Sequence, residues 1–333
     1  MIKIGEFDFI AQIQRQFASK HEFVSLGIGD DAAAFIPSRG CLSLLTTDTL
    51  IEDIHFTRTY SSFEQVGIKA VAVNLSDIAA MGGQPRAFLI SLGVPNNMEC
   101  SDLNQLYKGI LKASRPSNLA LIGGNTTRTN GPFFISITLH GEVSKKQMIT
   151  RCTATLGDAI YVTGTLGDAA AGLDCLKQGR ATKGYRHLLQ RQRCPEARTT
   201  EGMLIAKTGI ASAMIDISDS LSADLNHMMQ QSRVGAELTR TQIPLSLALK
   251  RYAKQHKMDA LDFALYGGED YELLFCVPPS KEKKLTQLIK NDFIQATRIG
   301  KICSKREGIF MLGADKKKQA LRAKGYDHFL EKS

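Results

Sequence analysis

The sequence contains no tryptophan and no closely spaced pair of cysteines. Its seven cysteines are odd in number, and even the nearest two, Cys175 and Cys194, are 19 positions apart, so a CxxC metal or redox motif is absent. Separated cysteines in odd number favour reduced thiols in a cytosol over a disulfide framework. The N-terminus lacks the apolar run of a signal peptide, and no stretch of about 18 apolar residues occurs. We therefore expect a cytoplasmic protein without a membrane partner.

Common nucleotide-binding signatures are missing as well. No GxxxxGK[ST] run is present, which excludes a P-loop enzyme, and no HRD and DFG pair is present, which excludes a protein kinase. Gly27-Ile28-Gly29 resembles part of a dinucleotide fingerprint, but the third glycine is missing and two aspartates follow where a phosphate would lie. A dinucleotide site is therefore rejected too.

Length and composition allow two ordinary domains. The chain has 333 residues, of which 43% are hydrophobic, so large cores are possible and disorder is not indicated. The pattern of elements restarts between residues 144 and 157, and we expect an N-terminal domain over 1–145 and a C-terminal domain over 146–333.

The net charge of +9 is concentrated near the end of the chain. From Lys281 onward there are 14 Lys and Arg against 6 Asp and Glu, a local excess of 8 positive charges. Nucleic-acid binding is one interpretation and a solvated basic face is the other. The second is favoured because no aromatic-interleaved or helix-turn-helix pattern accompanies the charge, so we expect no nucleic-acid partner.

Periodicity in the first half predicts an α/β domain. Residues 61–81 are expected to form a buried helix, capped by Ser61 or Ser62 and ended by Gly82-Gly83. The other expected elements are helices over 7–17 and 101–113, and strands over 42–47, 119–122 and 133–143, the last two flanking a loop at 123–125.

Periodicity in the second half predicts an α+β domain with a polar, exposed excursion over 179–200. The expected strands are 159–163, 213–217, 271–277, 296–303 and 308–312, and the expected helices are 168–177, 201–208, one starting at 221, and one near 280–290.

Six short segments place aspartate or an amide beside glycine, serine or threonine. They are residues 27–31, 46–49, 74–77, 123–128, 216–219 and 267–270. A Mg²⁺ ion that binds together with a polyphosphate takes oxygen ligands, which a fold can bring together from distant segments. Clustered carboxylates repel each other unless a cation neutralises them. Each aspartate alone has a simpler explanation as a turn or helix cap, except Asp77, which lies within an apolar helix. Together the segments indicate a magnesium-dependent, nucleotide-using enzyme.

Among basic residues, His55, Arg128 and Arg151 are candidates for phosphate contacts. For His55 a loop position without function is equally compatible with the sequence. Surface pairing is the more common role of a single arginine.

The order of these motifs resembles the thiamine-monophosphate kinase family of the PurM-like (aminoimidazole-ribonucleotide synthetase) superfamily. The resemblance covers nearly the whole chain. It runs through GEF (5–7), GIGDD (27–31), TTDT (46–49), VNLSDIAAMG (73–82), IGGNTTR (122–128), VTGTLGDAAAGL (162–173), IDISDSL (215–221), GGEDYEL (267–273) and GYDHF (325–329).

The resemblance implies two PurM-like domains, an α/β domain followed by an α+β domain, in a homodimer paired through the N-terminal domains. It implies transfer of the ATP γ-phosphoryl group to thiamine monophosphate, assisted by several Mg²⁺ ions and without a general base. The implied Mg²⁺ ligands are Asp31, Thr46, Thr47, Asp48, Asp77, Asn125, Asp216 and Asp219. The implied ATP contacts are Gly124, Asn125, Arg151 and Ser218, and the implied substrate contacts are His55, Glu269 and Ala323.

Three positions depart from the family pattern. Asn125 stands where the family has aspartate, so one metal is expected to be held more weakly. Ser220 replaces the glycine of SDGL, which raises the question of a left-handed backbone there. Ala323 stands where some members have a tryptophan that stacks on the substrate, and Tyr326 or Phe329 are the aromatic alternatives.

Two rival functions remain open on the sequence. One is another superfamily enzyme that activates an amide, a carboxylate or selenide with ATP, against which the GGEDYE and GYDHF segments argue. The other is a weakened nucleotide-binding homologue, suggested by Asn125 and Ala323.

Overall fold

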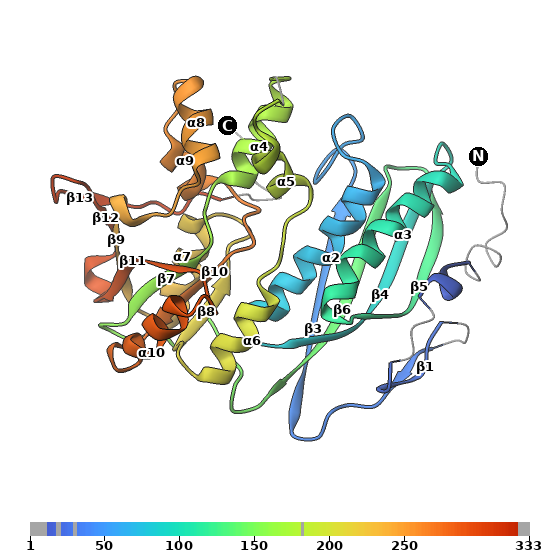
Figure 1. Ribbon diagram of the computed structural model, residues 1–333, viewed down its shortest axis with the longest axis horizontal. Coiled ribbons are helices and arrows are strands. Elements are labelled where there is room, and N and C mark those ends of the chain that lie inside the picture. The colour runs from blue at the N-terminus through green and yellow to red at the C-terminus, as the bar shows by residue number, and fades with distance from the viewer. Residues whose placement is uncertain (1–11, 18–20, 29–31, 181–182, 326–333) are drawn as a thin grey trace. The chain divides into compact units, whose positions relative to one another are not determined.

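The computed structural model describes residues 12–17, 21–28, 32–180 and 183–325 and divides into two compact units (Figure 1). One unit comprises Met1–Ile78 and Gly83–Lys146, and the other comprises Ala79–Gly82 and Gln147–Ser333. Asp31 and the end of the GYDHF segment lie outside the described residues. Residues 7–11 of the helix expected over 7–17 also lie outside them, and residues 12–16 are helical.

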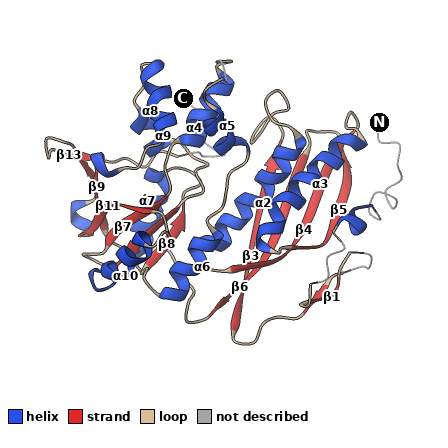
Figure 2. Ribbon diagram, in the orientation of Figure 1, coloured by secondary structure: helices blue, strands red, loops and turns tan. Residues whose placement is uncertain are grey.

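The first unit is a four-stranded sheet with two helices on one face. Its strand order is β3-β6-β4-β5, with β4 and β5 parallel and the other neighbours antiparallel. Figure 2 shows the two helices crossing this sheet. The elements are β3 (Cys41–Ile51), α2 (Phe63–Ala80), β4 (Gln84–Pro95), α3 (Cys100–Ser114), β5 (Ala120–Thr129) and β6 (Phe134–Ser144), with a small hairpin of β1 (Val24–Leu26) and β2 (Ala34–Phe35) and a 3₁₀ turn, Arg115–Ser117.

The prediction of a buried, capped α2 is confirmed. Ser62 Oγ accepts a bond from Gln65 N, and the Gln65 side chain accepts one from Ser62 N, so the first turn is closed reciprocally. After the last turn Gly82 takes a φ of +69°, a left-handed conformation that suits glycine.

Helices α2 and α3 touch through their backbones. A Cβ on Gly67 of α2 would lie 2.2 Å from Leu106 O, and one on Gly109 of α3 would lie 1.9 Å from Glu64 O. Only glycine permits this approach, so the two residues set the distance between the helices.

Two expectations for the first unit are wrong. The strand expected to end at Thr47 continues to Ile51, because β3 pairs with β6 over its whole length. The loop expected at residues 123–125 is the middle of β5, which pairs with β4 from Ala120 to Thr129. Glycine and polar residues are weak strand formers, but pairing with a buried neighbour overrides that preference.

The second unit is a seven-stranded mixed sheet with helices. Its order is β13-β12-β9-β11-β7-β10-β8. The strands are β7 (Ala159–Thr163), β8 (Ala213–Asp216), β9 (Gly235–Thr239), β10 (Leu273–Val277), β11 (Ala296–Cys303), β12 (Ile309–Leu312) and β13 (Lys318–Ala320). The helices are α4 (Asp168–Lys177), α5 (Arg186–Arg193), α6 (Thr199–Thr208), α7 (Leu221–Ser232), α8 (Leu247–Gln255), α9 (Ala260–Tyr266) and α10 (Pro279–Lys290), with 3₁₀ turns at Arg240–Gln242 and Lys305–Glu307.

The expected exposed excursion over 179–200 is wrong in part. It contains α5, whose Leu188 and Leu189 are buried in a cluster with Tyr252. Arg191 of the same helix is also buried, because it pairs with Glu272. The prediction relied on polar composition, and an arginine that is buried with a carboxylate partner cannot be told from a surface arginine by composition. Across the described ranges, no helix has both the length and the apolarity to cross a bilayer.

Candidate functional site

In the first unit, β3 and α2 bring two predicted metal ligands together. Asp48 lies on β3 and Asp77 on α2, and Thr46 Oγ1 donates a hydrogen bond to Asp77 Oδ2. Burial, and then the charge of Asp77, raise the pKa of Asp48 to about 6. Two carboxyls that hinder each other's ionisation form a place where a cation is favoured.

The donor chemistry of this pair suits Mg²⁺. Carboxylate and hydroxyl oxygens are hard ligands, and Asp48, Asp77 and Thr46 supply them from two elements. Within the described ranges, however, no three His, Cys, Asp or Glu side chains are grouped so as to hold a metal ion. The residues thus fit a magnesium ion that takes further ligands from phosphate oxygens or water.

Strand pairing places Asn125 away from this pair. Along the sheet, Asp48 pairs with Ile137, Ile137 with Ile90, and Ile90 with Gly124. Asn125 is one residue further on, so the pleat turns its side chain to the other face, the one that carries Thr47. The structure therefore places Thr46, Asp48 and Asp77 on one face and Thr47 with Asn125 on the opposite one.

Gly124 has a packing reason to be glycine. A Cβ at this position would lie 2.2 Å from Ile90 O, the backbone of the neighbouring parallel strand. The glycine is thus required by the approach of β4 and β5, whether or not a phosphate lies against it.

His55 has a defined tautomer when neutral. It lies in the turn after β3, where its Nδ1 accepts a bond of 3.0 Å from Ile51 N. A backbone N–H can only donate, so the ring proton is on Nε2. Nε2–H is then the donor of this ring, and such a group suits an anionic oxygen.

In the second unit, the loop between β8 and α7 is organised by a carboxylate that sequence reasoning missed. Asp224 Oδ2 accepts bonds of 3.1 Å from the backbone N–H groups of Ser218, Asp219 and Ser220. Burial raises the pKa of Asp224 to about 7, an effect that these bonds oppose and the charge of Asp219 reinforces. The only signal in sequence was an acid in the first turn of the helix after the motif. Asp216, at the end of β8, is buried.

Ser220 needs no left-handed backbone, which answers the question raised by its replacement of glycine. Its φ of 170° is ordinary extended chain. Its Oγ accepts a bond from Ala223 N and donates one of 2.6 Å to Lys324 O. Ser222 Oγ donates to the same carbonyl. The chain beside Ala323 is thus held at the start of α7.

The GGED loop, residues 267–270, lies against the same β8–α7 loop. Glu269 N donates to Ser218 O at 2.7 Å, and a Cβ on Gly268 would lie 2.6 Å from that oxygen. Glu269 and Ser218, predicted for substrate and for ATP, are therefore backbone neighbours. Arg151, by contrast, is exposed in the segment before β7, where its carbonyl accepts a bond from Ser232 Oγ.

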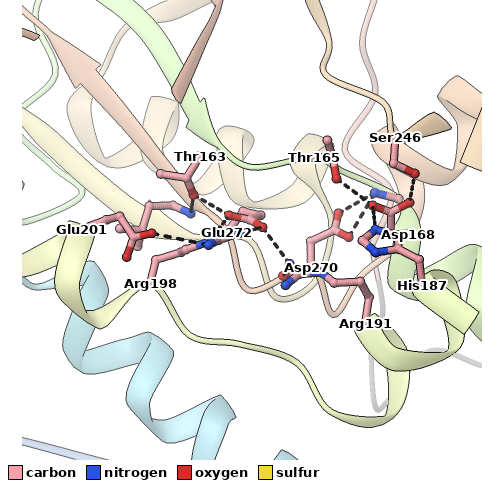
Figure 3. Close-up of polar contacts among 12 residues, drawn as sticks. Thr163, Thr165, Asp168, His187, Arg191, Arg198, Glu201, Ser246, Asp270 and Glu272 are labelled. Carbon is pink, nitrogen blue, oxygen red and sulfur yellow. Dashed lines mark hydrogen bonds and ion pairs between the residues drawn. The ribbon is translucent and has the colours of Figure 1, made fainter. Parts of the chain in front are cut away.

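A buried polar network follows the GGED loop and was not predicted (Figure 3). At one end Glu272 faces Arg191, Arg198 and Thr163. At the other end Asp168, at the start of α4, accepts bonds from Thr165, Ser246 and His187. Glu272 comes soon after the GGED motif and directly before a buried strand. A carboxylate buried there requires a cationic partner, and from this the sequence could have predicted the network.

The two units match the two halves of one domain family. Residues 29–143 match the model of the AIR synthase related protein, N-terminal domain, and residues 155–313 match that of its C-terminal domain. With the sheets and loops described above, these matches define a two-domain protein of the AIR synthase related class.

Relatives at full length narrow the class. The chain is 39% identical over 333 residues to thiamine-monophosphate kinase of Aquifex aeolicus, covering 98% of this chain and 99% of the relative. It is 35% identical over 330 residues to the enzyme of Bacillus subtilis, covering 98% and 100%. The chain belongs to the thiamine-monophosphate kinase family, as its motifs predicted.

Solved structures agree. The crystal structure of thiamine-monophosphate kinase from Stenotrophomonas maltophilia K279a has a TM-score of 0.83 at 35% identity, covering 95% of this chain and 98% of that one. AaThiL complexed with AMPPCP and TMP has a TM-score of 0.78 at 38% identity, covering 98% and 97%. The expected fold of a PurM-like α/β domain followed by an α+β domain is confirmed.

Proposed function

We propose that the protein is a magnesium-dependent kinase that transfers the γ-phosphoryl group of ATP to thiamine monophosphate, giving thiamine diphosphate and ADP. The observation that carries the proposal is the pairing of Asp48 with Asp77 in a chain similar over its full length to such kinases. ATP as the co-substrate follows from membership of the family, and the metal is the further step proposed here.

The reaction suits a site without a strong base. The accepting oxygen belongs to a phosphate that is already largely ionised at neutral pH, so the chief difficulty is the approach of two polyanions. Bound Mg²⁺ would neutralise phosphate charge and align the reacting groups. Asp48, Asp77 and Thr46 would hold the metal in the first unit, with Asp31 as the further ligand implied by the family motif.

Roles for the remaining residues follow from their chemistry. His55 would donate from Nε2–H to the substrate phosphate, and Glu269 suits the cationic thiazolium or the aminopyrimidine of thiamine. Ser218 and Arg151 would contact ATP, and Asp216 and Asp219 would hold metal in the second unit. Thr47, Gly124, Asn125 and Ala323 keep their family-implied roles as predictions.

The direct test is to incubate the pure protein with ATP, thiamine monophosphate and Mg²⁺ and to separate the products by chromatography. Thiamine diphosphate formed in equal amount to ADP would support the proposal. No product at any millimolar Mg²⁺ concentration would overturn it. ADP without thiamine diphosphate would point to another acceptor, the activity of the superfamily rivals.

Asn125 favours a second candidate, a homologue weakened in metal binding at a place other than the Asp48–Asp77 pair, from which Asn125 faces away. The amide oxygen is a neutral ligand where the family motif has a charged one. Asn125→Asp is therefore expected to lower the Mg²⁺ concentration for half-maximal activity by about tenfold, a difference of about 1.4 kcal/mol. Titration of both proteins with Mg²⁺ measures this, and an unchanged requirement would show that Asn125 is not a weakened ligand.

We also infer a homodimer in which the open face of the first unit's sheet meets its copy. On this face Leu45 is 73% exposed and Leu89 is 41% exposed, among hydroxyls of Thr47, Thr49 and Thr138. A sheet face that carries exposed leucines is typical of an interface. A second copy is the proposed occupant because the family motifs imply pairing through this domain.

A further inference from the structure

The GGED loop and the residue that follows it include two non-glycine residues in the left-handed region. Glu269 has a φ of +66° and Tyr271 a φ of +51°, with Asp270 between them. Each such residue costs on the order of 1–3 kcal/mol, and the conformation persists only where surrounding contacts enforce it. Strain of this kind gathers at functional sites.

One set of contacts holds the centre of the loop. Asp270 is buried, and its carboxyl accepts bonds of 2.9 and 3.0 Å from Gly167 N. Its carbonyl accepts a bond of 2.9 Å from Arg191 Nη2. Asp270 therefore fixes the loop through its side chain, which contacts Gly167, and through its backbone carbonyl, which contacts Arg191.

A second set holds the end of the loop. Glu272 is 1% exposed and accepts two bonds of 2.6 Å from Arg198, through Nε and Nη2. It also accepts a bond of 2.7 Å from Arg191 Nη2 and one from Thr163 Oγ1. A buried carboxylate paired in this bidentate way has one geometry, so it fixes the backbone that carries it.

The loop then presents its backbone to the β8–α7 loop. Ile217 N donates to Glu272 O, Tyr271 N donates to Ile217 O, and Glu269 N donates to Ser218 O, at 2.7–2.8 Å. A shift of Glu272 would therefore move Glu269 as well. Because Arg191 touches both Asp270 and Glu272, the two sets of contacts act as one clamp.

We propose that Glu272, Arg191 and Arg198 are positioning residues that hold the left-handed GGED loop so that Glu269 meets the cationic thiamine of the substrate. The inference rests on the proposed function and adds residues to it. The effect of the clamp is on substrate affinity, through the orientation of one carboxylate.

The test compares Glu272→Gln with Glu201→Gln. Glu201 pairs with the same Arg198 at 3.4 Å but lies on α6, outside the GGED loop, so its variant is a matched control. Glu272→Gln is expected to raise the KM and the calorimetric Kd for thiamine monophosphate by about tenfold or more, with a smaller change in kcat and in the KM for ATP. Glu201→Gln is expected to change each by less than about twofold.

A clamp that serves only stability would lower the melting temperature without a selective rise in the KM for thiamine monophosphate, and that result would overturn the proposal. Equal effects of the two variants would overturn it too. If Glu272→Gln does not fold, Arg198→Lys decides, because it keeps the charge and loses the bidentate pair. Arg198→Lys should raise the same KM by less than Arg198→Gln does, and equal or absent effects would sink the idea. A wild-type protein without kinase activity would instead refute the proposed function.

Discussion

At position 220 a serine hydroxyl joins two segments that are far apart in sequence. Ser220 Oγ caps α7 and donates to the Lys324 carbonyl, and its side chain is fully buried. A glycine at this site, as in the family motif, could do neither. The serine is therefore compatible with the fold and adds an attachment for the chain around Ala323.

Replacing that hydroxyl should loosen the attachment. Ser220→Gly is expected to cost about 1 kcal/mol of stability, since a buried hydrogen bond contributes about that much and glycine is itself a tolerable cap. Trypsin should cleave after Arg322 and Lys324 faster than in the wild type, as mass spectrometry would show. Ser220→Ala separates the lost hydroxyl from the added backbone freedom. Unchanged cleavage in both variants would contradict the attachment.

The raised pKa of Asp48 predicts that removing this acid stabilises the folded protein near neutral pH. Because its folded-state pKa, about 6, lies above its ordinary value of 3.8, the stability it contributes is present at low pH and lost as pH rises through about 6. Without Mg²⁺, Asp48→Asn should therefore raise the melting temperature at pH 7.5, by about 2 °C or more, and by about half as much at pH 5, where a carboxyl of ordinary pKa is already ionised in the unfolded chain.

The same experiment with Mg²⁺ tests the metal. Mg²⁺ should raise the melting temperature of the wild type more at pH 7.5 than at pH 5, because only the ionised Asp48 binds it. The Asn variant should lose most of this response. A lower melting temperature for the metal-free variant at pH 7.5 would show that the Asp48 charge is already neutralised within the protein.

At the scale of elements, the contact of α2 with α3 depends on two glycines. Gly109→Ala is expected to destabilise the protein by about 1–3 kcal/mol, because the added methyl meets Glu64 O and overpacks the contact. The roughly 1 kcal/mol that alanine gains in helix propensity is too small to offset this. Urea denaturation measures the difference. Gly131→Ala, where the new Cβ would meet only Thr129 Oγ1 at 3.5 Å, is the control, and equal midpoints would contradict the argument.

Which elements the sequence could predict follows from how each is stabilised. Helices α2 and α7 begin at serine caps and α4 shows helical periodicity, and the predicted bounds agree with the structure closely. Strands β3 and β5 carry polar residues and glycine in the middle, and pairing decides their length. A single sequence does not show pairing, so part of each was read as a loop.

Site residues that belong to a recognisable motif could be predicted from the sequence. Residues whose role depends on being buried were missed. Asp48 and Asp77 were expected in one ligand set, and Asp77 lies near enough to raise the pKa of Asp48, while their role as metal ligands stays a prediction. Asp224, Arg191 and Arg198 were missed because an acid in a helix turn and arginines in a basic stretch read as solvated. Only the tertiary fold shows that they hold the loops that carry Ser218 and Glu269.

At the scale of the whole molecule, the open sheet face predicts self-association. Leu45→Asp is expected to convert a dimer to a monomer, because a charge at the centre of an apolar contact is costly to bury. Light scattering after size-exclusion chromatography measures the mass. Leu247→Asp is a matched control, since Leu247 is 71% exposed on the second unit. A wild-type monomer, or a dimer that survives Leu45→Asp, would refute this interface.

The alternation of β3 also constrains how this gene can vary. Its eleven residues pair in unbroken register with β6, inward and outward side chains taking turns. A single-codon deletion before Thr46 would leave every later residue chemically intact yet turn each to the opposite side. Leu45 and Thr47 would face α2, and Asp48 would face away from Asp77. Among homologues we therefore expect length changes to fall outside this strand, even where nearly every amino acid within it has been exchanged.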